Sequence, residues 1–521
     1  MIKPRNILLT LVVPLLVAVV LLGGNFLMDR VRISVPSSRL ANPGFESDKP
    51  SAGLSGWHTA GPANAFAIER EAHGGNYCLA QQGVDAPVEA WQRLEGLTDG
   101  WYTLRAWVRS SGEQRTAYIT LKDCGSLEQR ASVPVAPQEA WLQIVVSAEV
   151  KGGKCTIGLG SEGGQKAWVS FDDVELVPGR AALSIMGADV SSLKKSEDKG
   201  GLYTYEDGTP GDALQILTDH GLNAIRLRVW VDPADGYHDK NELLVMARRA
   251  KELGIKVLVD FHYSDTWADP GKQYKPAAWE KLDFEGLKKA LYDHTYQVCH
   301  SLAAQGTPPY MVQVGNEINS GMLWPDGHSD RWDNLAALLK EGYRAVKDCS
   351  PSTLVMLHLA EGGKNDQSRW WFDNAVQRGV PFDLIGVSYY SYWHGTLADL
   401  QNNINDITAR YGKDVIVVET AHAFTRENND HETNIILGQI VPGYPFSREG
   451  QEKMLADVMA IVRAVPDGRG LGIFYWEATW TAVEGNGWSP TNPESGNAWE
   501  NQALFDYQNK PLPAMRLFGI P

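Results

Sequence analysis

The sequence lacks the short motifs that mark several large enzyme classes. It contains no Walker-type phosphate-binding loop, so a nucleotide site has no support. It contains no HExxH string and no cluster of histidines, which are the usual signals of a metal-dependent hydrolase. Its cysteines show no CxxC spacing, which speaks against a structural zinc site or a thioredoxin-like motif.

An excess of positive charge is also missing. The chain carries 48 Lys and Arg against 63 Asp and Glu, a net charge of -15. This balance argues against nucleic acid or an anionic membrane surface as the main partner. Aromatic residues, in contrast, are abundant, with 18 Trp and 19 Tyr. Flat aromatic faces stack on the apolar faces of sugar rings, so this abundance fits a polysaccharide-binding protein, although many of these Trp must fill cores.

The cysteine count is odd. The chain has five, at Cys78, Cys124, Cys155, Cys299 and Cys349. An exported protein could pair some of them, for example Cys299 with Cys349, but the sequence does not fix the connectivity.

The N-terminal segment predicts export. Lys3 and Arg5 precede an uncharged run over 7–28 that is long enough to span a bilayer, and the positive residues place the N-terminus in the cytoplasm. We interpret residues 1–30 as a signal peptide or an N-terminal membrane anchor and favour the anchor, because no clear A-x-A cleavage site follows. Residues 31–38 read as a linker. The rest of the chain is then secreted or held at the cell surface or in the periplasm, with a possible membrane tether.

Residues 39–180 predict an all-β domain. Apolar and polar residues alternate with period two in WYTLRAWVRS, TAYITLKD, WLQIVVSAEV, KCTIGLGS and WVSFDDVELV, and no convincing amphipathic helix appears. This pattern indicates a β-sandwich or jelly roll.

Residues 181–521 predict a (β/α)8 barrel. Eight strand-like runs alternate with helix-period segments, of which ELLVMARRAKELG and WDNLAALLKEGYRAVKDC are clear examples. The expected strands are 184–191, 223–230, 256–263, 310–317, 353–360, 383–390, 414–421 and 472–479.

The ends of these strands carry the chemistry, because barrel enzymes place their sites there. Glu317 ends the fourth strand after Asn316, and Glu419 ends the seventh, so the two can face each other across the barrel mouth. Retaining glycoside hydrolysis needs two such carboxyls, one to protonate the leaving oxygen and one to attack the anomeric carbon. Arg226 is placed to keep Glu419 ionised, Asn316 to bind the sugar 2-hydroxyl, and Asp189, at the end of the first strand, to bind substrate.

Several strings resemble glycoside hydrolase family 53, the endo-β-1,4-galactanases of clan A. They are GADVSSL, IRLRVWVDP, DFHYSDTWADPGKQ, QVGNEINSGMLWPDG, GVSYYSYWHG and NQALFDYQNKPLPA, and they occur in order over 183–520. The resemblance implies Glu317 as acid/base, Glu419 as nucleophile, and the β-1,4-galactan of type I arabinogalactan as substrate. It also implies substrate contacts from Arg226, His262, Trp267, Asp269, Asn316, Tyr390 and Trp476. No cofactor is required for this chemistry.

The resemblance also raises the question of calcium. Some members of this family hold a calcium ion in the loop after the seventh strand, and here that loop offers Asp430, His431 and Asn434 in a different spacing. Hard oxygen ligands suit calcium, so a structural calcium is possible, the alternative being a solvated polar loop.

The N-terminal domain, with LANPGFES near its start and FDDVEL near its end, resembles a galactose-binding-type carbohydrate-binding module. The alternative is a spacer that binds nothing. The candidates for a sugar platform are Trp57, Trp91, Trp101, Trp107, Trp141 and Trp168. We expect Trp107, inside a regular strand, to be core, and Trp57 and Trp91, in turns, to be the better candidates.

Two other functions stay open. One is another clan A endo-β-glycanase, of mannanase or cellulase type, with the same two glutamates. The other is a cell-surface glycan-binding protein whose barrel has lost catalysis. The oligomeric state is not predicted.

Overall fold

The computed structural model describes residues 40–50, 53–134 and 140–519. The predicted signal peptide or membrane anchor (1–30) and the linker (31–38) lie outside these residues. Within the described part of the chain, no helix is both long enough and apolar enough to cross a bilayer.

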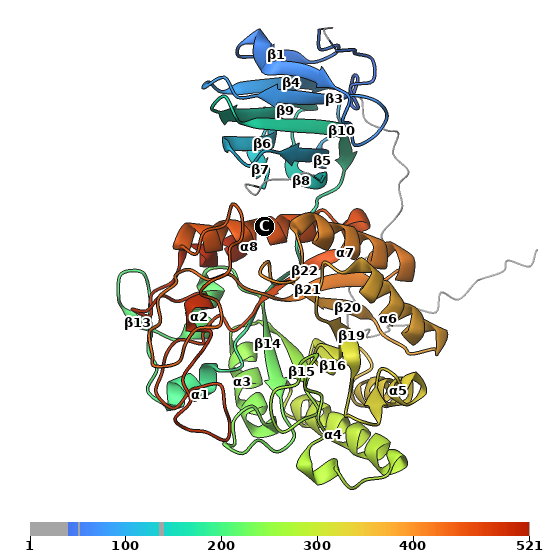
Figure 1. The fold of residues 1–521 in the computed structure, drawn as a ribbon, viewed down its shortest axis with the longest axis vertical. Helices are drawn as coiled ribbons and strands as arrows, with labels where there is room; N and C mark the ends of the chain where they lie inside the picture. Colours follow the sequence, from blue (N-terminus) through green and yellow to red (C-terminus); the bar gives the residue numbers. More distant parts are fainter. Residues whose placement is uncertain (1–39, 51–52, 135–139, 520–521) are drawn as a thin grey trace, which may run out of the picture. The chain divides into compact units, whose positions relative to one another are not determined.

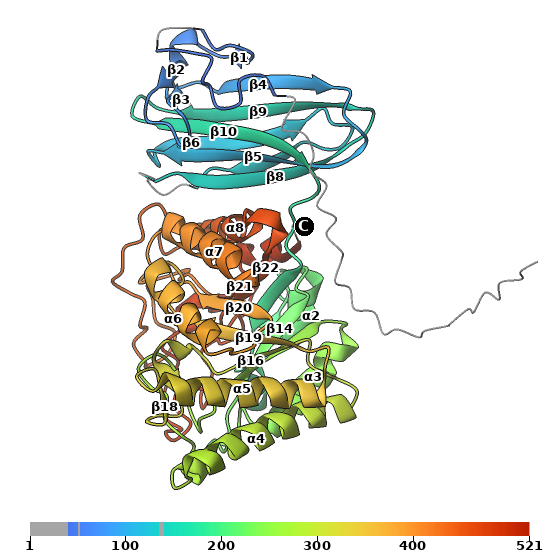
Figure 2. The same ribbon diagram turned by 90° about the vertical axis from the view of Figure 1, so that its right-hand side faces the viewer.

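The N-terminal domain consists of two five-stranded antiparallel sheets (Figure 2). One has the order β1 (His58–Ala60), β4 (Val88–Glu95), β9 (Lys154–Gly163), β6 (Gln114–Lys122) and β7 (Gln129–Ser132). The other has the order β2 (Phe66–Glu69), β3 (Cys78–Gln82), β10 (Trp168–Pro178), β5 (Gly100–Ser110) and β8 (Leu142–Val150). The predicted all-β domain is confirmed.

Three expectations about its tryptophans are wrong. Strand β5 buries Leu104, Ala106 and Val108, so the alternating side chain of Trp107 lies half-buried on the outer face of the sheet. Membership of a regular strand does not say which face a residue occupies. Trp57 is only 6% exposed and stacks on Phe45 at 5.5 Å, so it belongs to the core and offers no sugar platform. Trp91 lies inside strand β4, where it pairs with His58, and not in a turn.

The suggested Cys299–Cys349 disulfide is also wrong. The disulfide joins Cys124 to Cys155 within the N-terminal domain. Cys299 and Cys349 are free thiols that contact each other between α4 (Phe284–Ala304) and α5 (Trp332–Cys349).

The C-terminal domain is a closed barrel of eight parallel strands surrounded by helices (Figure 1). In order the strands are β11 (Ile185–Asp189), β14 (Ala224–Val229), β15 (Lys256–Phe261), β16 (Met311–Val314), β19 (Leu354–Leu359), β20 (Leu384–Ser388), β21 (Asp414–Thr420) and β22 (Gly470–Tyr475). Strand β11 pairs with both β14 and β22, which closes the barrel. Seven strands fall within their predicted ranges, and β22 begins at Gly470, two residues before its predicted range, so the (β/α)8 prediction is confirmed.

The remaining helices are α1 (Leu193–Asp198), α2 (Ala213–Asp219), α3 (Lys240–Glu252), α6 (Asn365–Gln377), α7 (Leu397–Tyr411) and α8 (Arg448–Arg463). Local sequence sets their ends. Helix α7 starts with a capping box between Thr396 and Asp399 and ends at Gly412, whose left-handed φ of 62° suits glycine.

The lower part of the barrel interior is filled by apolar side chains from all eight strands, which are Ile185, Ala224, Leu258, Met311, Met356, Leu384, Ile416, Val418 and Phe474. This packed layer leaves the carboxyl ends of the strands as the open side.

Candidate active site

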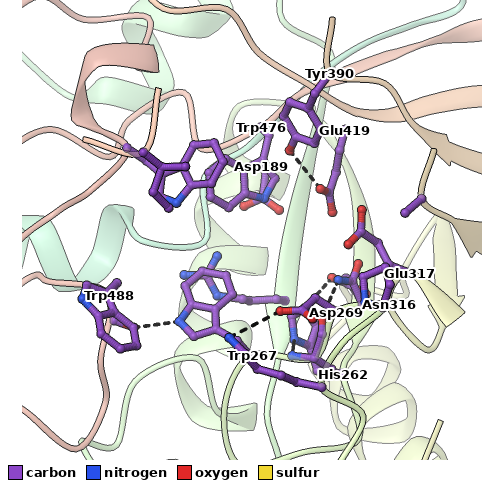
Figure 3. Close-up of a pocket in the computed structure, with 18 of the residues that line it drawn as sticks. Asp189, His262, Trp267, Asp269, Asn316, Glu317, Tyr390, Glu419, Trp476 and Trp488 are labelled. Carbon is purple, nitrogen blue, oxygen red and sulfur yellow. Dashed lines mark hydrogen bonds and ion pairs between the residues drawn. The ribbon is translucent and has the colours of Figure 1, made fainter. Parts of the chain in front are cut away.

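A cleft of about 780 Å³ opens at the carboxyl ends of the barrel strands (Figure 3). All ten residues predicted for the site line it. They are Asp189, Arg226, His262, Trp267, Asp269, Asn316, Glu317, Tyr390, Glu419 and Trp476. Strand ends far apart in the sequence therefore meet in one cavity.

Glu317 and Glu419 point toward one another in this cleft (Figure 3). One carboxylate oxygen of each lies within 4.8 Å of the other. Glu317 follows β16 in a left-handed backbone conformation, with φ 46° and ψ 54°, which residues other than glycine rarely adopt. Such strain persists only where the surroundings hold it, and it is frequent at functional sites.

Arg226 is the centre of a buried ion network. It is 1% exposed, and its Nη1 lies 2.9 Å from Oδ2 of Asp189. Its Nη2 lies 2.8 Å from both Oδ2 of Asp260 and Oε1 of Glu419, and it donates to Oδ1 of Asn316 at 2.8 Å. A guanidinium suits this task because its planar fork presents several donors at once.

The pKa values of the two glutamates follow from these surroundings. Burial, and then the charge of Glu419, raise the pKa of Glu317 to about 8. Burial also raises the pKa of Glu419, but Arg226 and the Tyr390 hydroxyl, which donates to Oε2 at 3.0 Å, oppose this. The pair is therefore arranged to hold one proton, on Glu317.

A hydrogen-bond chain fixes the orientation of Glu317. Two donors face Nδ1 of His358, the Glu317 backbone N–H at 3.3 Å and Nε2 of Gln313 at 2.9 Å, against one acceptor, Oδ1 of Asn316 at 3.0 Å. We therefore assign the ring proton to Nε2. Nε2 then donates to Oγ of Ser388 at 2.8 Å, and Ser388 donates to Oε1 of Glu317 at 2.7 Å. Because Oε1 already accepts the hydrogen bond from Ser388, the acidic proton of Glu317 is placed on Oε2.

Known proteins share this barrel. The family model described as glycosyl hydrolase family 53 matches residues 185–518. The chain belongs to glycosyl hydrolase family 53.

Relatives within family 53 cover the same region. An endo-beta-1,4-galactanase of Bacillus subtilis is 36% identical over 381 residues, which are 66% of this chain and 87% of that protein. A probable arabinogalactan endo-beta-1,4-galactanase A of Aspergillus terreus is 40% identical over 336 residues, covering 63% and 92%. Among solved structures, the family 53 catalytic domain of Ignisphaera aggregans is 40% identical with a TM-score of 0.62, covering 65% of this chain and 96% of that one.

Two further predicted residues lie at the floor of the family 53 cleft. Nδ1 of His262 accepts the backbone N–H of Ala268 at 3.0 Å, so its Nε2 donates to Oδ2 of Asp260, also at 3.0 Å. Asn316 donates one amide hydrogen to the Ala268 carbonyl at 2.8 Å, which leaves its second hydrogen for a ligand.

The carboxylates of Asp189 and Asp269 differ in burial and in how far protein groups already occupy their oxygens. The oxygens of Asp189 are taken by Arg226 and by the backbone and hydroxyl of Ser191, and the residue is fully buried. Its direct contact with substrate stays a prediction. Asp269 is half-buried at the cleft edge and its charge helps to raise the pKa of Glu317.

The wall of the cleft is aromatic. The Trp267 ring lies over the Arg228 guanidinium at 4.1 Å, and its indole N–H donates to the carbonyl of Trp488 at 2.7 Å. Trp476 packs edge-on against Trp499 with ring centroids 4.9 Å apart. Trp393 and Trp488 are 45% and 46% exposed, so the aromatic surface reaches solvent.

Glu317, His358 and Glu419 also come close enough together to hold a metal ion. Their atoms are engaged otherwise, because Arg226 and Tyr390 occupy Glu419, and Ser388 joins His358 to Glu317. The guanidinium already supplies the positive charge here, so the donor set does not fit a cation.

Sequence reasoning missed His358, Ser388, Gln313, Trp480, Trp488 and Trp499. The first three had a usable signal, because each is a polar residue inside an otherwise apolar strand. The tryptophans follow β22 in a region without regular periodicity, so no sequence signal placed them in the cleft.

Proposed function

We propose that this chain is a retaining endo-β-1,4-galactanase, with Glu317 as acid/base and Glu419 as nucleophile. The observation that carries the proposal is the approach of the two carboxylates to within 4.8 Å. Retaining enzymes hold this pair about 5 to 5.5 Å apart, whereas inverting enzymes need about 6.5 to 9.5 Å to admit a water molecule.

The first half of the reaction uses both glutamates together. Glu317 donates the proton on Oε2 to the glycosidic oxygen while Glu419 attacks the anomeric carbon and forms a glycosyl ester. Arg226 keeps Glu419 ionised until that attack. The free amide hydrogen of Asn316 binds the 2-hydroxyl, a contact that strengthens in the transition state.

The second half follows from the coupling of the pair. Once Glu419 is esterified, its negative charge no longer raises the pKa of Glu317. Glu317 then stays ionised, takes a proton from water, and directs the hydroxide to the anomeric carbon. Ester cleavage restores Glu419, and no cofactor enters either step.

The substrate rests on the family. Relatives named as galactanases and a cleft lined by tryptophans support β-1,4-galactan, including that of arabinogalactan. An open aromatic cleft suits internal cleavage of a chain.

The test is turnover by the full-length protein on linear β-1,4-galactan, β-mannan and β-1,4-glucan, with the first anomer identified by NMR. We expect oligosaccharides from galactan alone, released first as the β-anomer. An α-anomer would contradict retention, and turnover confined to mannan or glucan would favour the other clan A activities. Binding without turnover would favour a glycan-binding protein.

We also propose that the protein is exported, as a secreted or membrane-tethered enzyme. The uncharged run over 7–28 and the Cys124–Cys155 disulfide support this, because disulfides persist in oxidising compartments. The N-terminal domain would then hold the enzyme on its polymer, which raises the local substrate concentration.

We propose that a calcium ion binds at the loop after β21, with a changed ligand set. Asn434 is 3% exposed and Glu500 is fully buried, and within the described part of the chain neither Oδ1 of Asn434 nor Oε2 of Glu500 has a hydrogen-bond partner. Nδ2 of Asn434 lies 3.3 Å from Oε1 of Glu500, so the two groups are neighbours. Burial, opposed by backbone N–H donors, raises the pKa of Glu500 to about 7, and the charge of Asp430 adds to the increase.

We propose Asn434 and Glu500 as ligands, since unpartnered oxygens suit a hard cation. Both carboxylate oxygens of Asp430 accept backbone N–H groups, from Glu432 and Asn497 at 2.7 Å, so Asp430 would add negative charge beside the ion. His431 contacts the carbonyl of Glu494 instead. The ion would serve to order this loop.

A further inference from the structure

We propose that the N-terminal domain carries a second, non-catalytic sugar site centred on Arg109 and Trp168, which binds one residue of β-1,4-galactan. The identity of the polymer rests on the proposed function; the position and chemistry of the site do not. The site is a cavity of about 230 Å³ lined by Glu69, Glu71, Gln82, Arg109, Gln165, Lys166, Ala167 and Trp168. It is smaller than the roughly 300 to 1,000 Å³ of a drug-sized pocket, which suits a single sugar ring.

Neighbouring strands of one sheet bring these side chains together. Strand β10 pairs with β3 on one side and β5 on the other. This register sets Trp168 opposite Gln82 and Ser170 opposite Arg109. Arg109 alternates with the buried Val108, so it projects from the outer face. The remaining residues come from the end of β2 and the segments at 70–77 and 164–167, which border the cavity.

Arg109 is held in place before any ligand binds. Its Nη2 donates to Oε2 of Glu71 at 2.7 Å, and its guanidinium carbon lies 5.2 Å from the Trp141 ring centroid and 5.6 Å from that of Trp168. Its side chain is only 13% exposed, although Glu71 is 77% exposed. A fixed guanidinium with an adjacent carboxylate loses little entropy on binding a ligand.

The mixture of charges selects a neutral ligand. Glu69 and Glu71 would repel an anion, while Arg109 and Lys166 would repel a cation. Sugar hydroxyls both donate and accept hydrogen bonds, so they can satisfy carboxylates, cations and amides together. The indole of Trp168 adds an aromatic surface for the apolar face of the ring.

The other tryptophans of this face are less available. The His73 ring stacks on Trp107 at 3.8 Å and lies edge-on to Trp141 at 6.0 Å, and neither tryptophan lines the cavity. Trp168 is therefore the tryptophan that lines the cavity and serves as the platform.

The test is affinity electrophoresis of the full-length protein in gels cast with β-1,4-galactan, in a Glu317→Gln background that prevents turnover. We expect Trp168→Ala and Arg109→Ala each to weaken the apparent affinity at least about fivefold. Gln82→Ala, which changes an exposed lining side chain without disturbing the core, should weaken it measurably. Arg115→Ala, which changes an exposed arginine of the other sheet, is the matched control and should be retained like its parent.

Two results would overturn the proposal. One is unchanged retention of both Trp168→Ala and Gln82→Ala proteins that unfold at the same temperature as the parent. The other is loss of retention only on Trp91→Ala, which would place the site on the opposite sheet. Hydrolysis of galactan by the protein with Glu317 intact is measured in parallel, so failure of the proposed activity is distinguishable from failure of this site.

Discussion

The Nη2 atom of Arg226 lies 2.8 Å from Oε1 of Glu419, and the same residue joins Asp189 and Asp260 at 2.9 and 2.8 Å. One buried guanidinium thus forms ion pairs with three carboxylates.

Replacement Arg226→Met should lower the free energy of unfolding by about 3 kcal/mol or more, because removing one partner leaves buried charges uncompensated. Urea denaturation followed by tryptophan fluorescence measures this. Arg410→Met, at a surface pair with Asp373, is the control and should change little; an equal loss in both would contradict the role of the network.

The nucleophile must be ionised, so its pKa sets the acidic limb of the pH profile. The Tyr390 hydroxyl lowers the pKa of Glu419, and Tyr390→Phe therefore raises it. We expect the acidic limb of kcat/KM to move to higher pH. Tyr389→Phe is the matched control, because the Tyr389 hydroxyl donates to the Gly395 carbonyl instead. An unchanged acidic limb in Tyr390→Phe would sink this assignment.

The basic limb should respond to Ser388. The acid must be protonated, and its pKa of about 8 predicts that kcat/KM falls above that pH. The Ser388 hydrogen bond lowers the pKa of Glu317, so Ser388→Ala should move the basic limb upward. Ser391→Ala, at a hydroxyl without a hydrogen-bond partner among the residues that the structure describes, serves for comparison. A shift of the basic limb to lower pH would contradict the hydrogen bond from Ser388 to Glu317.

Substrates with different leaving groups should distinguish the roles of the two glutamates. Glu317→Gln should lower kcat on galactan roughly 10²- to 10⁴-fold, because general acid catalysis is lost. It should lose far less on an aryl β-galactobioside whose leaving group needs no proton. Glu419→Gln should lose turnover on both substrates, since no nucleophile remains. Steady-state kinetics with the two substrates check this. An equal fall of kcat on both substrates in the Glu317 variant would indicate that the two roles are exchanged.

Calcium should stabilise the protein through Glu500. Millimolar calcium should raise the midpoint of thermal unfolding, and Glu500→Gln should remove that increase. Because the pKa of Glu500 is about 7, the stabilisation should weaken as the pH falls below that value. Differential scanning calorimetry measures both effects. Glu484→Gln, at an exposed position, should keep the full response, and no response in the unaltered protein would exclude the ion.

The barrel was readable from the sequence because its strands are apolar runs that end in polar groups. Glu317 and Glu419 stood out for the same reason, and all ten predicted side chains line the cleft. The sequence did not show the orientation of individual side chains. Whether Trp107 faces the core, or which nitrogen of His358 carries its proton, follows from strand faces and hydrogen-bond partners that only the folded chain defines.

The link between the Trp267 indole and the Trp488 carbonyl joins segments 221 residues apart in the chain. One side of the cleft therefore depends on the tail that follows the last barrel strand, while Glu317 and Glu419 sit on strand ends within the barrel. Changes in that tail can alter how many sugar residues the cleft holds, and hence the size of the products. In this architecture, catalysis and the extent of substrate binding depend on different segments and can change independently.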